Sequence, residues 1–178
     1  ATAADAKGLM RAALREPSPV LFHRVNGLGL QRGSVPQAED FLVPIGSAVV
    51  RREGTHATLL TYGSMVEPTL SAADALEIEG LQLEVIDLRT LVPIDWLRVL
   101  ESVHKTKRAM VVHEAMRTAG PGAEIAAHIQ EEAFYDLEMP VFRVAGKGLP
   151  LLQHGALEVL CIPSVEEIVA AARYLCCR

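Results

Sequence analysis

Residue types suited to acid–base chemistry meet at one point of the chain, where His113 is followed by Glu114. A histidine beside a carboxylate at the end of a buried strand could act as a general acid or contact a phosphate group. The alternative is a histidine that holds a loop in place through hydrogen bonds, and we favour this structural interpretation. The other histidines are scattered without ligand spacing such as H-x-x-x-H, so we expect no metal site.

Two glycine-containing stretches have the composition of anion-binding loops. Gly27, Gly29 and Gly33 follow the pattern G-x-G-x-x-x-G, which is not the dinucleotide spacing, and no helix is expected directly after Gly33. The turn Gly120-Pro121-Gly122 is better placed, because it precedes an expected helix whose free amides could face an anion. We favour a tight strand-to-helix turn there and expect no nucleotide at the first stretch.

Nucleophilic chemistry has little support in the sequence. There is no G-x-S-x-G motif, and no serine lies in a context that would activate it. Asp87 and Arg89 could form an ion pair with each other at a strand end, where we expect them to order the turn at residues 90–93. The residues alone therefore predict no complete active site, and His113 and Glu114 are the candidates that remain.

The elements that must position these residues alternate regularly after residue 45. β-rich apolar runs are separated by segments with helical spacing, which is typical of an α/β fold with a mostly parallel sheet covered on both faces. The carboxyl ends of such strands are the usual location of ligands. The expected strands are residues 48–51, 57–61, 83–87, 109–113 and 141–144. The expected helices are residues 68–79, 95–104, 122–134 and 165–175, with Asp95 and Ser164 as candidate caps.

The first 45 residues have a different character. Residues 5–15 show helical spacing, with Asp5 near the amino-terminal cap, and residues 20–22 form an apolar run that predicts a short strand. Residues 25–45 are rich in glycine and proline without periodicity, as in a linker. A single helix and strand cannot bury their own apolar faces, so we expect them to belong to a larger domain.

Composition excludes several classes of function. The formal net charge is −5 and the only basic cluster, at residues 105–108, is short, so we expect no nucleic-acid partner. No apolar run approaches the roughly 20 residues that span a bilayer, and we expect no membrane association. The three cysteines lack disulfide or metal-ligand spacing and are expected to be reduced, as in an intracellular protein.

A series of motifs runs along the chain in a recognisable order. The most specific is E-V-I-D-L-R-T-L-V-P-I-D at residues 84–95. Shorter motifs are V-P-I-G at 43–46, R-E-G at 52–54, T-Y-G-S-M-V at 61–66, S-V-H-K-T at 102–106, G-A-E-I-A at 122–126, E-E-A-F at 131–134 and P-V-F-R-V at 140–144. In their order and spacing these motifs resemble the beta subunit of thiamine-diphosphate-dependent 2-oxo acid dehydrogenases, the first (E1) component of those complexes.

The resemblance implies a division of the chain and a fold. Residues 46–178 would be the transketolase-like C-terminal domain, a three-layer α/β/α sandwich, and residues 1–24 the remnant of a pyrimidine-binding domain, joined by the linker at residues 25–45. In this family the residues that hold thiamine diphosphate and Mg²⁺ lie in the earlier part of the beta subunit and in the alpha subunit. We therefore expect no catalytic, cofactor-binding or metal-binding residue in this chain and no activity from it alone.

The same resemblance implies a role and partners. The complete enzyme would oxidatively decarboxylate a 2-oxo acid, of the pyruvate, branched-chain or acetoin type, and acylate the lipoyl arm of the E2 acyltransferase. This domain would serve subunit assembly and docking. Its partners would be the E1 alpha subunit or an alpha-equivalent domain, a second beta subunit and the E2 subunit-binding domain. The expected location is the cytoplasm in a bacterium or the mitochondrial matrix in a eukaryote.

Two other functions remain open. The chain could be a stand-alone α/β module for interaction or dimerisation, or the C-terminal domain of another transketolase-superfamily enzyme. In each case an isolated domain is expected to cover its apolar surface by self-association, because large exposed apolar patches are uncommon on monomers. We therefore expect a dimer.

Overall fold

Helices and strands alternate along most of the chain. The computed structural model describes residues 1–25, 27–30, 32–148 and 159–177. The strands are β1 Val49–Arg52, β2 Ala57–Thr61, β3 Leu83–Asp87, β4 Ala109–Met116 and β5 Phe142–Gly146. The helices are α1 Ala3–Ala13, α2 Val66–Glu77, α3 Trp96–Thr106, α4 Pro121–Glu132 and α6 Val165–Cys176, with 3-10 turns η1 Gly27–Leu30 and η2 Gly63–Met65.

The five strands form one mostly parallel sheet. Their order is β1-β3-β2-β4-β5, with β1 antiparallel to β3 and every other pair parallel. The parallel strands of an α/β sheet are covered on both faces, and every residue of β2 and β3 is accordingly buried. The predicted mostly parallel sheet is confirmed, with an antiparallel strand at one edge.

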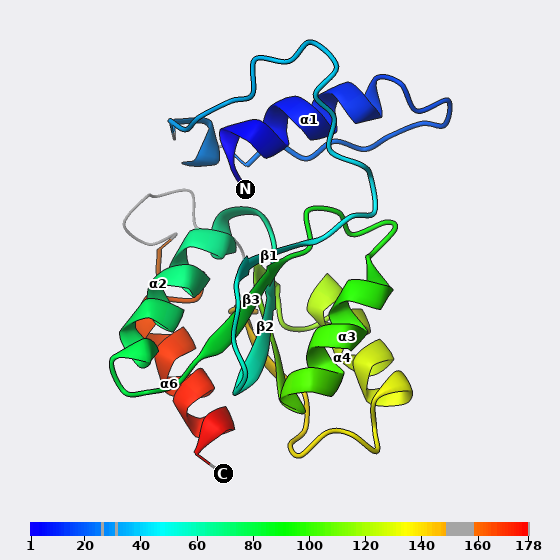
Figure 1. The fold of residues 1–178 in the computed structure, drawn as a ribbon. Coiled ribbons are helices and arrows are strands. Elements are labelled where there is room, and N and C mark those ends of the chain that lie inside the picture. Colours follow the sequence, from blue (N-terminus) through cyan, green and yellow to red (C-terminus); the bar gives the residue numbers. More distant parts are fainter. Residues whose placement is uncertain (26, 31, 149–158, 178) are drawn as a thin grey trace.

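The sheet separates two apolar cores. Successive side chains of a strand point to opposite faces, so Leu59 packs with α2 and α6 whereas Leu60 packs with α3 and α4. Val85 and Ile86 of β3 divide in the same way. Figure 1 shows the two helix pairs on opposite sides of the sheet. The three-layer α/β/α sandwich expected from the sequence is confirmed.

Local capping explains where several helices begin. Asp95 accepts a hydrogen bond from the backbone N–H of Arg98 at 3.2 Å, as its predicted cap role requires. Ser164 and Glu167 form a capping box at the start of α6. In α1 the cap is Thr2, and Asp5 completes a capping box with it.

The first 45 residues differ from the prediction in one respect. The helix is confirmed as α1, but the strand predicted at residues 20–22 is wrong, because no described strand pairs with this segment. A strand needs a hydrogen-bonded neighbour, and the sheet of this chain does not provide one there. The linker expected at residues 25–45 contains η1 and otherwise no helix or strand among its described residues; Asn26 and Gln31 lie outside them.

Three smaller observations concern the cysteines, the helix lengths and the position of α1. The structure places no disulfide among the described cysteines, of which Cys161 is buried and Cys177 exposed. No helix within the described ranges has the length and apolar character needed to cross a membrane. Helix α1 lies beyond the end of the sheet, separate from both helix layers (Figure 1).

Candidate functional site

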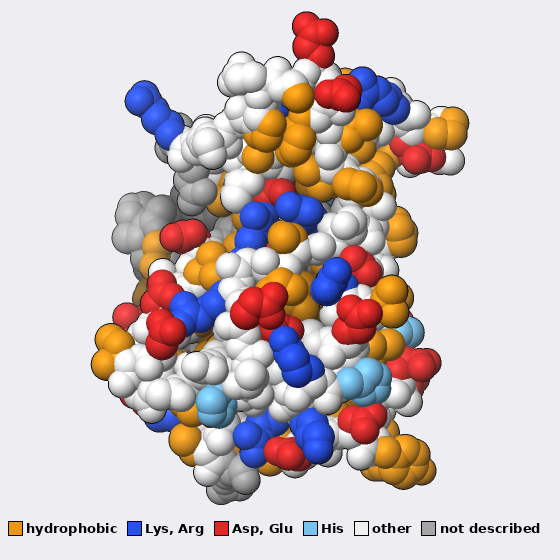
Figure 2. Space-filling model, in the orientation of Figure 1, with side chains coloured by type: hydrophobic (Ala, Val, Ile, Leu, Met, Phe, Trp, Pro, Cys, Tyr) orange, Lys and Arg blue, Asp and Glu red, His pale blue; other side chains and the backbone are white. Residues whose placement is uncertain are grey.

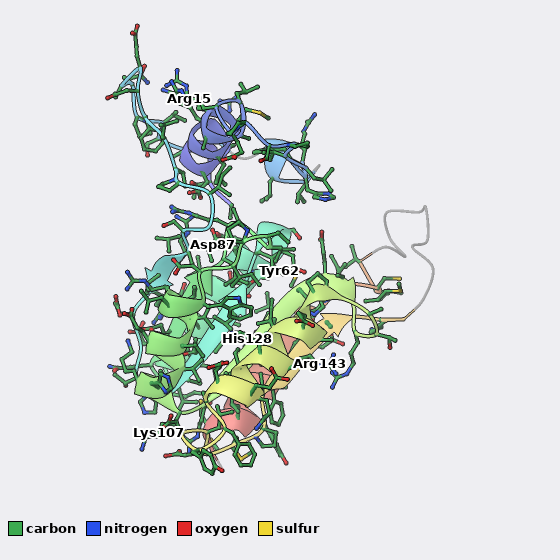
Figure 3. The ribbon with its side chains drawn as sticks, turned by 90° about the vertical axis from the view of Figure 1, so that its right-hand side faces the viewer. Arg15, Tyr62, Asp87, Lys107, His128 and Arg143 are labelled. Atoms are coloured by element: carbon green, nitrogen blue, oxygen red, sulfur yellow. The ribbon has the colours of Figure 1, made fainter. Side chains whose placement is uncertain are left out.

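The carboxyl ends of β2, β3 and β4 lie level with one another and carry the polar residues that the sequence singled out. Thr61 pairs in register with Asp87 of β3 and with Val112 of β4. Tyr62 and His113 follow these paired positions directly. Figure 3 shows Asp87 and Tyr62 at the end of the sheet that faces α1, with Lys107 at the opposite end. This carboxyl edge is where an α/β sheet usually binds ligands.

His113 is completely buried at this edge, and its ring packs against the start of α4. A Cβ atom added to Gly122 would overlap Nε2 and Cδ2 of the ring, and one added to Gly120 would lie 3.2 Å from Cε1. The ring of Tyr62 is nearly parallel to that of His113, at 10°, with centroids 6.2 Å apart. The two glycines therefore allow the helix to approach the imidazole closely.

The environment of this edge keeps both aromatic groups uncharged at neutral pH. Burial, and then the charge of Arg143, lowers the pKa of His113, although the Ala115 backbone acts in the opposite direction. Burial, and then the nearby Glu114, raises the pKa of Tyr62 to about 12. Neither ring nitrogen of His113 makes a hydrogen bond of regular geometry with a described residue.

Glu114 takes no part in this packing. Its side chain is exposed, and its Oε2 accepts a hydrogen bond from the hydroxyl of Ser64. Successive strand residues point to opposite faces, so two neighbours in sequence are poorly placed to share a proton. The structure brings His113 together with Tyr62 and Gly122 instead of with Glu114. A general-acid role for His113 would require water or substrate to reach a ring that has no exposed surface.

A second group of side chains at the same edge forms a buried ion cluster, which joins α1 to β1 and β3. Asp87 has no exposed surface and accepts from Arg51 at 2.8 Å. Arg51 also donates to Asp5, which is 3% exposed. Asp5 in turn pairs with Arg89 at 2.8 Å. Together with the amino terminus, which lies 3.2 Å from Asp5 and 3.4 Å from Asp87, two acids and two arginines thus pair with one another across three segments that are distant in sequence.

The ion cluster corrects the pairing that the sequence predicted. Asp87 and Arg89 were expected to pair with each other, but only the backbone N–H of Arg89 contacts the Asp87 carboxylate, at 3.0 Å. The reason is that Asp87 faces Arg51 on the adjacent strand, while the Arg89 guanidinium reaches Asp5 in α1. The one signal of the cluster in the sequence is the presence of charged residues at the ends of apolar strands.

The electrostatics of Asp5 show how the cluster favours charge. Burial opposes ionisation of its carboxyl group, but hydrogen bonds from Thr2 and the positive charges of the amino terminus and Arg51 outweigh burial. Together they hold the pKa of Asp5 well below its usual range. Helix α1 is therefore attached to the sheet by a carboxylate that remains ionised at neutral pH.

The glycine stretches have structural explanations within the described residues. Gly27 begins the 3-10 turn η1. No described α-helix starts directly after Gly33, so no helix amides are offered to a phosphate group there. Gly120 is the cap of α4 without a side-chain hydrogen bond, and Pro121 starts the helix. The favoured interpretation of this second stretch, a tight strand-to-helix turn, agrees with the close approach of Gly122 to His113.

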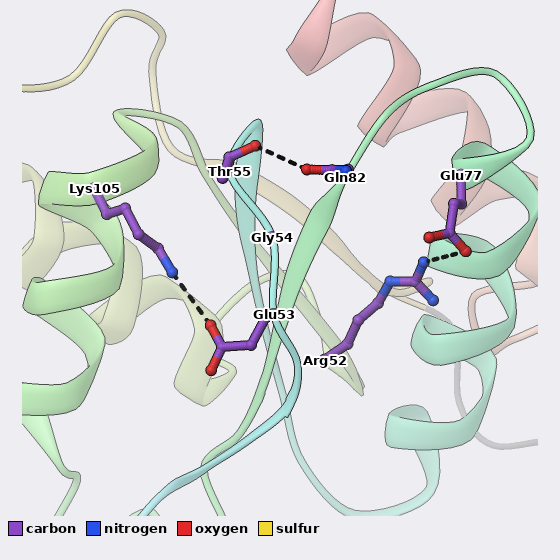
Figure 4. A pocket seen from close by; sticks show the side chains of 7 residues that line it. All are labelled: Arg52, Glu53, Gly54, Thr55, Glu77, Gln82 and Lys105. Atoms are coloured by element: carbon purple, nitrogen blue, oxygen red, sulfur yellow. Dashed lines mark hydrogen bonds and ion pairs between the residues drawn. The ribbon is translucent and has the colours of Figure 1, made fainter.

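The opposite end of the sheet carries a cleft of about 350 Å³. Figure 4 shows two ion pairs facing across it: Arg52 with Glu77 at 2.8 Å, and Lys105 with Glu53 at 3.5 Å. Beneath it the buried carboxylate of Glu84 accepts from Lys105. Because acids and bases already satisfy one another here, a ligand would first have to break these pairs. The cleft offers no acid–base or nucleophilic group free for catalysis.

Comparison with known protein families identifies the family of this chain. Residues 46–168 match the family described as transketolase, C-terminal domain. The chain belongs to the transketolase C-terminal domain family. The matched range contains the whole sheet, helices α2, α3 and α4 and the first turn of α6, and it begins at the residue where the sequence placed the start of this domain.

Relatives of this transketolase C-terminal domain chain are E1 beta subunits. It is 42% identical to pyruvate dehydrogenase E1 component subunit beta of Rhizobium meliloti, over 98% of this chain and 38% of the relative. It is 41% identical to the mitochondrial subunit beta-1 of Arabidopsis thaliana, over 99% and 50%. It is 38% identical to 2-oxoisovalerate dehydrogenase subunit beta of Bacillus subtilis, over 96% and 53%. The chain spans about half the length of these relatives and matches their C-terminal portion.

A solved structure shares the fold of the transketolase C-terminal domain found here. It is described as a split gene transketolase, an inactive beta4 tetramer, and it aligns with a TM-score of 0.66 and 28% identity. The alignment covers 82% of this chain and 47% of that chain.

Proposed function

We propose that this chain is part of the beta subunit of a thiamine-diphosphate-dependent 2-oxo acid dehydrogenase, in which it serves subunit assembly and docking to the E2 acyltransferase. The observation that carries the proposal is the 42% identity to a pyruvate dehydrogenase E1 beta subunit over 98% of the chain. The relatives include both pyruvate and 2-oxoisovalerate dehydrogenases, so we propose a 2-oxo acid as the substrate of the complete enzyme. That enzyme would decarboxylate the acid and acylate the lipoyl arm of E2.

We also propose a division of the chain into three parts. Residues 46–178 form the transketolase-like C-terminal domain, residues 25–45 the linker, and residues 1–24 the end of a preceding pyrimidine-binding domain. The exposed apolar side chains of the first segment support this division, since they include Leu14 at 79% and Leu21 at 82% exposure. Figure 2 shows hydrophobic side chains gathered over this part of the molecule. A surface of this kind fits a segment that packs against further protein.

The residues of this chain do not fit thiamine diphosphate with Mg²⁺. The start of α4, the better candidate for binding a phosphate group, is closed by the ring of His113. Within the described residues no group of three or more acidic, histidine or cysteine side chains is placed to hold a metal ion. We therefore propose that the cofactors bind elsewhere in the complete enzyme, and that no catalytic step uses a residue of this chain.

The proposed partners are the E1 alpha subunit or its equivalent domain, a second beta subunit and the subunit-binding domain of E2. The relatives that support them are bacterial and mitochondrial proteins. We propose a cytoplasmic location if the chain is bacterial and the mitochondrial matrix if it is eukaryotic.

Calorimetry tests the proposed absence of a cofactor site. Titrating thiamine diphosphate and Mg²⁺ into the 178-residue chain should release no heat of binding, because no group within the described residues is placed to hold the diphosphate or the metal. The same titration into an alpha–beta complex containing a complete beta subunit is the positive control and should show saturable binding. Saturable heat from the chain alone would contradict the proposal and direct attention to His113 and the turn before α4.

Light scattering tests the proposed assembly role. The structurally similar transketolase chain is described as an inactive tetramer, which supports self-association of such a chain without its catalytic partner. We expect a dimer or larger species, and we expect Leu21→Ser to weaken it because Leu21 is 82% exposed among other apolar side chains. Ile78→Ser is the matched control, since Ile78 is 90% exposed on α2. A monomer at high concentration, or equal effects of the two substitutions, would contradict this prediction.

A further inference from the structure

Buried polar atoms that make no hydrogen bond of regular geometry with a described residue gather at the carboxyl ends of β2 and β4. They are the Thr61 hydroxyl, the Tyr62 hydroxyl and both ring nitrogens of His113. Folded proteins leave few such atoms unpaired, because each one forfeits its hydrogen bond to water. His113 differs from the two hydroxyls in one respect: it can gain a charge within the physiological pH range.

The packing around His113 leaves no room for the ring to reach water. The backbone at Gly122 touches Nε2 and Cδ2 so closely that a Cβ there would overlap them. Gly120, at the cap of α4, lies against Cε1. The helix starts at Pro121 with no side chain to cap it, so its partial positive charge is not offset by a capping group.

The charged groups near His113 do not stabilise an imidazolium ion. Arg143 of the neighbouring strand β5 is positive and disfavours it. Tyr62 of the β2 end is neutral, with a pKa of about 12. The acids of the adjoining segments are turned outward: Glu114 of β4 is exposed and bonded to Ser64, and Glu124 in the first turn of α4 is exposed. Only the Ala115 backbone favours the charged ring.

We propose that His113 is an acid-sensitive lock, in which the neutral ring holds the start of α4 against the ends of β2 and β4 and protonation of the ring releases that start. This inference goes beyond the proposed function and does not depend on it. The released state exposes the ring to water, where the imidazolium is solvated. The element that moves is the turn before α4 and the first turn of the helix.

The direction of the pH effect follows from the two states. The closed state disfavours the proton, whereas the open state binds it with the ordinary histidine pKa of about 6.5. The lock is therefore fully effective above that pH and weakens as the pH falls below it. Between pH 7.5 and 5.5 the equilibrium constant for opening should rise about tenfold. The reason is that pH 5.5 lies one unit below the pKa of the open state, so the protonated open form outnumbers the unprotonated open form about tenfold there.

Hydrogen exchange and ring NMR of the 178-residue chain test the lock. After correction for intrinsic rates, amide exchange at residues 122–125 should become about tenfold faster between pH 7.5 and 5.5. In His113→Met, whose side chain does not titrate, this extra acceleration should be lost. His23→Gln is the matched control, because His23 is exposed, and it should keep the acceleration.

If His113→Met fails to fold, the NMR spectrum of the His113 ring in the unaltered chain still tests the proposal. The His113 resonances should remain those of a neutral imidazole at pH 6.5, where an ordinary histidine is about half protonated. Half protonation of His113 at pH 6.5 or above would overturn the proposal. Exchange at the start of α4 that is independent of pH after correction would overturn it as well.

Discussion

Replacing Asp87 with alanine is expected to lower the free energy of unfolding by about 3–5 kcal/mol, the range for removing one partner of a buried ion pair. Asp87 has no exposed surface, and its carboxylate accepts from Arg51 at 2.8 Å and from the Arg89 backbone at 3.0 Å. Without it, a largely buried guanidinium loses a counter-charge and a buried N–H loses its acceptor. Urea unfolding at pH 7 measures the change.

A second substitution at Asp87 separates the effect of charge from that of shape, and a substitution at Glu79 is the control. Asp87→Asn keeps an oxygen for the Arg89 N–H but removes the negative charge, so its loss of stability should be smaller than that of Asp87→Ala. Glu79→Gln breaks the exposed pair between Glu79 and Arg173 and should leave the unfolding midpoint nearly unchanged. Equal midpoint shifts for Asp87→Ala and Glu79→Gln would contradict the role assigned to the ion cluster.

Replacing Gly54 with alanine is expected to destabilise the chain by about 3 kcal/mol or more, at the upper end of the range for overpacking. A Cβ at this position would overlap backbone atoms of Leu83 and Glu84 and lie 2.7 Å from the carbonyl oxygen of Gln82. Backbone atoms cannot rotate aside as a flexible side chain can. The turn that leads from β1 into β2 would have to move away from β3, as thermal or urea unfolding would show.

Gly148→Ala is the matched control for this substitution. An added Cβ at Gly148 meets no atom of a described residue within 4 Å, so the same chemical change should leave stability nearly unaffected. If both variants unfold at the same urea concentration, the close approach of Gly54 to the β3 backbone does not constrain the fold. A selective loss in Gly54→Ala would assign the R-E-G motif at residues 52–54 a structural role.

The ion cluster and the packing of His113 together show how the chain uses the carboxyl edge of its sheet. Both occupy the carboxyl edge of the sheet, which in other α/β proteins is the ligand site. Here the residues at this edge bind one another: Asp87 and Arg51 attach α1, and His113 supports α4. The carboxyl edge of this sheet is therefore used to attach α1 and α4 within the chain.

Much of the architecture was predictable because it depends on local patterns. The predicted strand at residues 83–87 coincides with β3 Leu83–Asp87, whose apolar residues Leu83, Val85 and Ile86 include two β-branched side chains. The start of α3 was predictable from Asp95, because a capping side chain acts within its own helix turn. The motif at residues 84–95 was sufficient to indicate the family.

The errors concern contacts between segments that are distant in sequence. The apolar run at residues 20–22 predicted a strand, but a strand exists only where a neighbour accepts its hydrogen bonds. The pairing of Asp87 with Arg51 spans 36 positions and links neighbouring antiparallel strands, which spacing alone does not reveal. The pairing predicted between Asp87 and Arg89 failed for the same reason.

The chain itself carries enough local information to determine its α/β class, the order of its elements and its resemblance to E1 beta subunits. Periodicity and capping act over a few residues, and motifs are contiguous in sequence. Only the tertiary structure decided what the chemically suggestive residues do. It buried His113 beneath α4, turned Glu114 outward and joined Asp87 to Arg51, because burial and the partners of a charge depend on which distant segments the fold brings together.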